Sequence, residues 1–173
     1  MKKGDRKEGN KPNPDGDASA SASKDLPEGA YAKAGGPIPS DALEATVVRR
    51  YKESYMHDRA VFQSPSGNIK CAVDASFAGC GIPSYRDTKP YGYSKTVGAN
   101  WWVDFKNWKL MPRDDVPPYT PDDGGSEIED VPYGKTIYFG DHVCHSEYNG
   151  MTCWNAKTGK GAFMSISKTE FFG

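Results

Sequence analysis

The sequence has few large apolar residues. Ile, Leu, Val and Phe together occupy 25 of its 173 positions, which is below the share expected for a fully folded chain. Disorder of the whole chain would also require a large net charge, whereas 22 basic residues nearly balance 23 acidic ones. The shortage is therefore local. Residues 1–37 contain a single member of this set, Leu26, so we expect a polar segment followed by a folded part.

Two further absences exclude classes of function. The chain has no basic surplus to displace counterions from phosphates, which argues against nucleic acid as its main partner. It also has no apolar run that approaches the length of a membrane span. We therefore expect the chain itself to be soluble and to reach a membrane only through an N-terminal anchor that lies outside it.

The first 37 residues predict a disordered polar stalk. They mix Gly, Pro, Ser and Ala with charges of both signs and show no apolar period. Such a segment cannot bury enough surface to offset an ordering entropy of roughly 1–2 kcal/mol per residue. Met1-Lys2-Lys3 is similar to the charged start of a signal peptide, but no apolar stretch follows it. Either the protein is cytosolic, or a signal or anchor has been removed.

Four cysteines form two pairs of equal spacing, Cys71 with Cys80 and Cys144 with Cys153. Zinc frameworks normally use closer pairs such as C-x2-C, so the spacing predicts disulfides and no metal ligand. Three connectivities are possible. Loop-closure entropy favours a long bridge, with about 4.6 kcal/mol for Cys71 to Cys153 against roughly 2.7 kcal/mol for a ten-residue loop.

Turn geometry favours the two short bridges instead. A four-residue loop over residues 147–150, built on a type I turn with Gly150 left-handed, places Cys144 opposite Cys153. A tight two-residue Asn149-Gly150 turn would place Cys153 opposite Ser146. The sequence therefore predicts the bridges Cys71–Cys80 and Cys144–Cys153. Bridged hairpins indicate an oxidising compartment, which in turn favours the removed signal or anchor.

Residues 38–58 predict a helix that leads into the domain. Asp41 and Glu44 have the spacing of a capping box. Apolar residues then recur every four positions, at Leu43, Val47, Tyr51 and Tyr55. This periodicity is typical of an amphipathic helix over about residues 41–55 that covers one face of a sheet.

Residues 59–173 predict a disulfide-containing β domain. Short segments rich in strand-forming residues alternate with Gly, Pro, Asn and Asp. These segments are 61–63, 69–73, 101–105, 135–139, 142–146, 151–155 and 162–166. The prediction is a mainly β fold, a small antiparallel β domain that is sandwich-like or barrel-like, with disulfide-stapled hairpins, one N-terminal helix and a disordered tail. Residues 112–132, rich in Pro, Asp and Glu, predict an acidic surface loop.

Two motifs resemble those of a domain of unknown function found in actinobacterial secreted proteins and lipoproteins. The opening motif is F-Q-S-P-S-G-N-I-K-C at residues 62–71, followed by Cys80-Gly81-Ile82. The closing motif includes G-M-T-C-W-N at 150–155 and T-G-K-G at 158–161. The resemblance spans roughly residues 61–172 and is weak over residues 84–130, where members of the family often carry further cysteines. It implies an extracytoplasmic, often lipid-anchored module and supplies no catalytic residues.

Polar residues that could support chemistry are explained more simply by structure. His142 and His145 point to opposite faces of an extended strand, so they cannot both bind one metal without a bulge. Ser64 and Ser66, with His57 upstream, could contribute to a hydrolase triad, but serines in a turn are explained by turn hydrogen bonds. The acidic loop does not follow the register of an EF-hand calcium site. We assign no catalytic residue, no metal ligand and no cofactor.

An aromatic cluster between residues 91 and 108 is the strongest candidate for a binding site. We select Tyr91, Tyr93, Trp101, Trp102 and Trp108. Alternation along a strand places Trp101 and Trp102 on opposite faces, so one can fill the core while the other stays at the surface. Exposed aromatics anchor protein partners or stack on sugars. The alternative is core packing in a domain with little Leu.

These patterns favour a membrane-tethered, extracytoplasmic and non-enzymatic binding or accessory module. Its expected partner is an envelope protein or a membrane protein complex. One alternative is a cell-wall or carbohydrate-binding module that uses the aromatic cluster. Another is a glycan hydrolase that uses paired carboxylates from the acidic loop.

Overall fold

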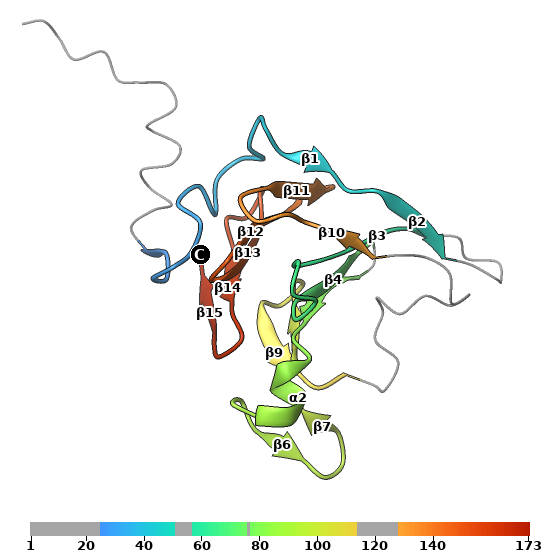
Figure 1. Cartoon of the computed structure of the whole chain (residues 1–173), viewed down its shortest axis with the longest axis vertical. Coiled ribbons are helices and arrows are strands. Elements are labelled where there is room, and N and C mark those ends of the chain that lie inside the picture. Colours follow the sequence, from blue (N-terminus) through green and yellow to red (C-terminus); the bar gives the residue numbers. More distant parts are fainter. Residues whose placement is uncertain (1–24, 51–56, 76, 114–127) are drawn as a thin grey trace, which may run out of the picture.

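The computed structural model describes residues 25–50, 57–75, 77–113 and 128–173 (Figure 1). Two mainly antiparallel sheets pack against each other and neither closes into a barrel. The predicted mainly β fold class is therefore confirmed.

The first sheet is built mostly from the last forty residues. Its spatial order is β1, β11, β12, β13, β14 and β15, and all neighbours are antiparallel except β1 and β11. The strands are β1 Leu43–Glu44, β11 Thr136–Phe139, β12 His142–Glu147, β13 Gly150–Asn155, β14 Gly161–Met164 and β15 Thr169–Phe172.

The second sheet takes most of its strands from the first half of the domain. Its order is β10, β3, β4, β5, β8 and β9, with β2 also paired to β3; only β10 with β3 is parallel. The strands are β2 Val47–Arg50, β3 His57–Gln63, β4 Lys70–Val73, β5 Ala78–Gly81, β8 Trp102–Asp104, β9 Lys109–Met111 and β10 Glu129–Asp130.

A separate excursion lies between β5 and β8. It contains the short helix α2 (Ser84–Thr88) and a two-stranded hairpin of β6 (Tyr93–Ser94) and β7 (Gly98–Ala99). In Figure 1 these elements lie at one end of the molecule, far from β1 and β2. The backbone N–H of Ile82 donates to the carbonyl of Trp101 (2.9 Å), which closes the excursion at its base.

Both predicted disulfides are confirmed. Cys71 of β4 lies directly opposite Cys80 of β5, and Cys144 of β12 lies directly opposite Cys153 of β13. Each bridge therefore joins neighbouring strands of one sheet. The predicted register of Cys144 with Cys153 is correct, although the ladder runs one pair further, to Glu147 opposite Gly150. The loop is consequently tighter than the four residues that the sequence predicts.

The predicted helix is wrong over its described part. Residues 43–44 and 47–50 are strands, while residues 51–56 lie outside the described part of the chain. β1 pairs with β11, and β2 pairs with β3. Each segment thus completes the edge of a sheet, and the β-branched pair Val47-Val48 favours an extended backbone. The apolar recurrence every four residues therefore did not reflect one helical face.

The predicted stalk is too long at its C-terminal end. Residues 1–24 lie outside the described part, but residues 25–38 pack on the outer face of the first sheet. Ala34 is fully buried, and the indole N–H of Trp154 donates to the carbonyl of Gly36 (2.8 Å). This face needs a cover because Val143 and Trp154 point away from the disulfides by strand alternation. The cover consists of Leu26, Tyr31, Ala34 and Ile38.

The main core lies between the two sheets and contains both disulfides. It combines apolar residues of β3, β4, β5 and β8 with residues of β12, β13 and β14. The predicted acidic loop needs a correction here, because Glu129 and Asp130 form β10 on the edge of this core, next to the buried Val131. Residues 114–127 of that loop lie outside the described part.

Candidate binding site

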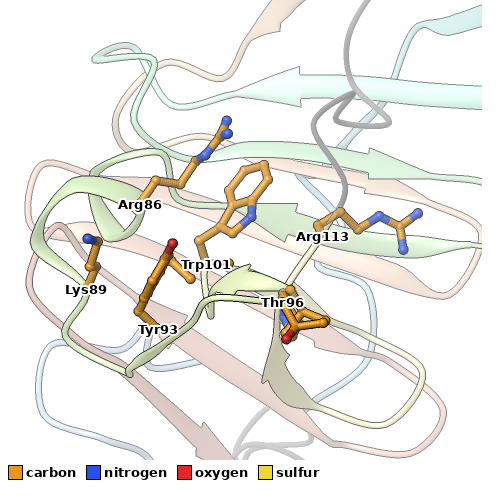
Figure 2. Close-up of a pocket in the computed structure, with 10 residues that line it drawn as sticks. Arg86, Lys89, Tyr93, Thr96, Trp101 and Arg113 are labelled. Atoms are coloured by element: carbon orange, nitrogen blue, oxygen red, sulfur yellow. The ribbon is translucent and has the colours of Figure 1, made fainter.

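A cavity of about 1020 Å³ lies beside α2 and the β6–β7 hairpin (Figure 2). It lies within the excursion and against the end of β9. The lining residues are Arg86, Lys89, Tyr93, Thr96, Val97, Gly98, Ala99, Trp101, Pro112 and Arg113. Four of the ten come from the segment 96–99 of the hairpin, so its conformation decides the shape of the cavity.

Local hydrogen bonds fix the path of the excursion. α2 ends at Lys89, which adopts a left-handed conformation (φ 51°) and donates its N–H to the carbonyl of Tyr85 (3.1 Å). The side-chain amide of Asn100 donates to the carbonyl of Tyr91 (2.9 Å). Gly92 and Gly98 have φ of 93° and 84°, values that side-chain-bearing residues rarely adopt. The two ends of the hairpin are therefore held together.

Two tyrosines, Tyr85 and Tyr91, anchor the excursion to the first sheet. The hydroxyl of the fully buried Tyr85 donates to the carbonyl of Ser165 (2.8 Å) and lies 3.1 Å from Thr169 Oγ1. Burial raises the pKa of Tyr85 well above its usual value of 10. The hydroxyl of Tyr91 accepts from the backbone N–H of Thr169 (2.7 Å). These bonds hold the wall of the cavity against the turn between β14 and β15.

Three cationic side chains surround the cavity, and each lies over an aromatic ring. The Arg86 guanidinium carbon lies 5.0 Å from the ring centre of Trp101, and Lys89 Nζ lies 4.4 Å from that of Tyr93. The Arg113 guanidinium carbon lies 4.1 Å from the Phe77 ring. These distances are in the range of cation–π contacts. Among the residues that the structure describes, the lining contains these three cations and no acidic residue or histidine.

Arg86 and Lys89 are exposed at the mouth of the cavity. Neither makes an ion pair with a carboxylate in the described ranges. Their aromatic partners differ, because Tyr93 is 56% exposed whereas Trp101 is only 2% exposed. The arrangement therefore combines a rigid floor at Trp101, an accessible ring at Tyr93 and two charged groups that can reach a ligand. A negatively charged group is the chemistry that this lining favours.

The structure brings two of the five predicted binding residues to this cavity, Tyr93 and Trp101. Tyr91 is used to anchor the excursion, as described above. Trp102 is completely buried in the main core. Trp108 packs on Phe105, with ring centres 4.6 Å apart, and lines a separate cavity of about 650 Å³.

The expectation that one of Trp101 and Trp102 stays at the surface is wrong. Their exposed fractions are 2% and 0%. The two rings meet edge to face with centres 6.2 Å apart, and both are covered by other side chains. Arg86 covers Trp101, while Phe77 stacks on Trp102 with ring centres 5.4 Å apart. Burial on both sides explains how a domain poor in Leu fills its interior.

The sequence interpretation missed Arg86, Lys89 and Arg113. A signal was present, because the two cations of 86–89 immediately precede the aromatic cluster and Arg113 follows it. Their convergence depends on the return of the chain through β8 and β9, which brings Arg113 to the cavity lined by Arg86 and Lys89. Spacing alone does not reveal that return.

Among the described residues, neither His142 nor His145 belongs to a cluster of three or more side chains that could bind a metal ion. His145 Nδ1 lies 2.7 Å from Thr136 Oγ1, and its ring stacks on Tyr31. Its Nε2 lies 3.7 Å from Glu147, too far for a hydrogen bond. Thr136 and His145 are 5% and 6% exposed, so a substrate cannot reach the pair. His142 stacks on Phe105, and the side-chain environment of His57 is outside the described part.

The other residues considered for chemistry have structural partners. Ser64 Oγ accepts from the N–H of Ile69 (3.2 Å), and Ser66 Oγ accepts from that of Asn68 (3.3 Å), as expected for turn serines. Glu129 accepts from the N–H of Thr46. Asp130 accepts from the side-chain amide of Gln63 (2.7 Å). The remaining carboxylates of the predicted hydrolase alternative lie in residues 114–127, outside the described part.

No family model matches the sequence, and no curated protein or solved structure shows significant similarity to it. Among the described residues, no helix has the length and apolar character needed to cross a membrane.

Proposed function

We propose that this protein is an extracytoplasmic, non-enzymatic binding or accessory module that contacts an envelope protein or membrane protein complex through the cavity beside α2. The cavity receives an acidic segment of that partner. The observation that carries the proposal is the lining itself, in which Arg86 and Lys89 lie over the rings of Trp101 and Tyr93 and Arg113 lines the same cavity.

The two disulfides support the compartment in this proposal. Bridges of this kind persist in oxidising surroundings and are rare in the cytosol. The proposal also includes a tether to the membrane. An N-terminal lipid or transmembrane anchor would hold the domain at the membrane, with residues 1–24 as the spacer between them. The resemblance to actinobacterial secreted and lipoprotein domains favours the same location.

A binding role fits the cavity better than catalysis does. A glycan hydrolase requires two carboxyl groups about 5 to 10 Å apart on either side of the substrate. Within the described part of the chain, the lining residues supply none. They supply instead a rigid floor and cations on aromatic supports. Groups of this kind can hold and orient an acidic ligand, and this is the role that we propose for them.

Charge reversal tests the proposal. The oxidised full chain is used to capture proteins from detergent-solubilised native membranes, alongside the double variant Arg86→Glu/Lys89→Glu. Lys135→Glu is the matched control, because Lys135 is equally exposed but lies at the start of β11 and does not line the cavity. We expect one stoichiometric protein to be captured by the wild type and by Lys135→Glu, with capture by the double variant weakened roughly tenfold or more.

Salt and sugar controls separate the alternatives. Capture through exposed charges should weaken between low and physiological ionic strength, because screening shortens the reach of these charges to about 8 Å. Equal capture by all three proteins would overturn the assignment of this cavity. Binding of acidic cell-wall glycan, lost in Tyr93→Ala and unaccompanied by a protein partner, would establish the carbohydrate-binding alternative instead.

A further inference from the structure

The four cysteine sulfur atoms form one cluster at the centre of the protein. Cys71 and Cys80 come from the second sheet, whereas Cys144 and Cys153 come from the first. The Sγ atoms of Cys80 and Cys153 are 4.0 Å apart, although no bond joins them. All four Sγ atoms lie within 4.8 Å of one another. The two disulfides are therefore in contact across the interface between the sheets.

This cluster is shielded from solvent on every side. The exposed fractions of the four cysteines are 0%, 0%, 1% and 0%. The Sδ atom of the buried Met151 lies 3.9 Å from Cys71 Sγ. The sulfur cluster is thus buried, with one pair of cysteine sulfur atoms on each of the two facing sheets.

One separation between the two bridges is already close to that in a thiolate metal centre. Zinc binds four thiolates tetrahedrally with Zn–S distances of about 2.3 Å, which gives sulfur–sulfur edges of about 3.8 Å. The contact between Cys80 and Cys153 already has nearly this length. The other separations between the bridges are at most 4.8 Å. After reduction, the two sulfur atoms of each former bridge would have to move apart to about 3.8 Å.

We propose that the reduced protein binds one Zn²⁺ ion through Cys71, Cys80, Cys144 and Cys153. Each disulfide is first reduced to two thiols. A dithiol supplies two electrons and two protons and becomes a disulfide, whereas a phosphine supplies two electrons and takes oxygen from a water molecule, which supplies the two protons. The thiols then lose four protons as their sulfurs bind the ion. The oxidised and metal-bound forms exclude each other, since the same sulfur atoms take part in both. This inference is independent of the cavity beside α2.

The metal ion would link the two sheets to each other, whereas each disulfide links two strands of the same sheet. Each disulfide joins strands within one sheet, so in the oxidised protein no covalent bond holds the two sheets together across the core. A single ion bound by two cysteines of each sheet crosses that interface. The sequence could not indicate this site. The two cysteines of each pair are separated by eight residues, a spacing that suits opposed strands rather than a C-x2-C zinc motif. The ligand set exists only because the sheets pack at this point.

Cobalt is a suitable first probe because its tetrahedral thiolate complexes absorb visible light. The full chain is reduced with a phosphine, freed of reductant without oxygen and titrated with Co²⁺ and then Zn²⁺. We expect one equivalent of Co²⁺ to give tetrahedral thiolate bands, and one equivalent of Zn²⁺ to remove them. Zinc at about 100 times its dissociation constant should raise the thermal midpoint of the reduced protein by about 5 °C or more.

Three controls decide whether the folded cluster is responsible. The oxidised protein should show no bands. Cys71→Ala/Cys80→Ala, which keeps the other bridge, offers two thiols after reduction and should lose the four-thiolate spectrum. The reduced chain in denaturant should bind cobalt more weakly. Hydrogen exchange of β4, β5, β12 and β13 should slow on zinc addition to the reduced native chain. Equal affinity in denaturant, a different stoichiometry, or no change in exchange or thermal midpoint would overturn the proposal.

Discussion

The rings of Tyr31 and His145 stack with their centres 3.6 Å apart and an angle of 15° between their planes. The backbone N–H of Tyr31 also donates to Thr152 Oγ1 (2.9 Å). This contact joins the N-terminal segment to two strands more than a hundred residues later. The segment 25–38 is therefore part of the folded domain, as a cover for the outer face of the first sheet.

Two truncations test this boundary. Removal of residues 1–24, which contribute little apolar surface, should leave the free energy of unfolding nearly unchanged. Removal of residues 1–36 also takes away Tyr31 and Ala34 and exposes Trp154, and it should cost roughly 2–4 kcal/mol by the usual cost of unburying large side chains. Urea unfolding of both proteins measures the difference. Equal stability of the two truncations would mean that residues 25–36 are not required as a cover.

Acid should destabilise the protein through its buried histidines. Burial lowers the pKa of His142 and of His145 below the ordinary value of 6.5, with smaller opposing effects of Asp141 and Asp41. The folded state then binds fewer protons than the unfolded state just below pH 6.5, so the free energy of unfolding falls as the pH falls through that region. Chemical denaturation at a series of pH values between 7.5 and 5.5 should show the loss.

His145→Gln separates this titration from simple packing. The amide can still bond with Thr136 but does not titrate, so the variant should lose part of the pH slope. The pKa of Glu147 is raised by burial above 4.5. Its contribution has the opposite sign, because a raised carboxyl pKa makes the folded state bind more protons than the unfolded state as the pH falls. An unchanged slope in His145→Gln would contradict the assignment to this residue.

Local signals predicted the hairpins well and the long-range contacts poorly. The cysteine spacing and the turn residues correctly placed Cys144 opposite Cys153, although the predicted four-residue loop over residues 147–150 is wrong because Glu147 pairs with Gly150. The pairing of β1 with β11 spans more than ninety residues, and no local pattern near Leu43 encodes it. The same limit applies to Trp102, since only the neighbouring segments that cover it decide its burial. Arg113 joins Arg86 at the cavity for a similarly long-range reason.

Replacement of either buried tryptophan by Ala should lower the free energy of unfolding. Trp101→Ala and Trp102→Ala should each cost roughly 3–5 kcal/mol, the usual range for a large aromatic in a core. Tyr93→Ala is the matched control from the same cluster, since its ring is 56% exposed, and it should change stability by less than about 0.5 kcal/mol. Guanidinium unfolding of all three variants provides the comparison. A stable Trp101→Ala protein would show that Trp101 is not a packed floor of the cavity.

Gly79 should be the most restrictive glycine near the binding cavity. A Cβ atom there would lie 2.5 Å from the carbonyl oxygen of Val103 and 2.6 Å from the Trp102 ring, so Gly79→Ala must displace β8 or its tryptophan. We expect a loss of about 1–3 kcal/mol, the usual cost of overpacking. Gly134→Ala is the control, because its Cβ meets nothing within 4 Å and only its φ of 83° opposes the change.

The position of Trp102 gives this substitution a second effect. Its ring contacts Trp101 edge to face, with centres 6.2 Å apart, and Trp101 forms the floor beneath Arg86. Displacement of Trp102 should therefore also weaken partner capture, whereas Gly134→Ala should leave capture unchanged. Both quantities can be measured at a temperature where the two variants remain folded. If Gly79→Ala lowers stability but leaves partner capture normal, then displacement of Trp102 does not move Trp101 in the cavity floor.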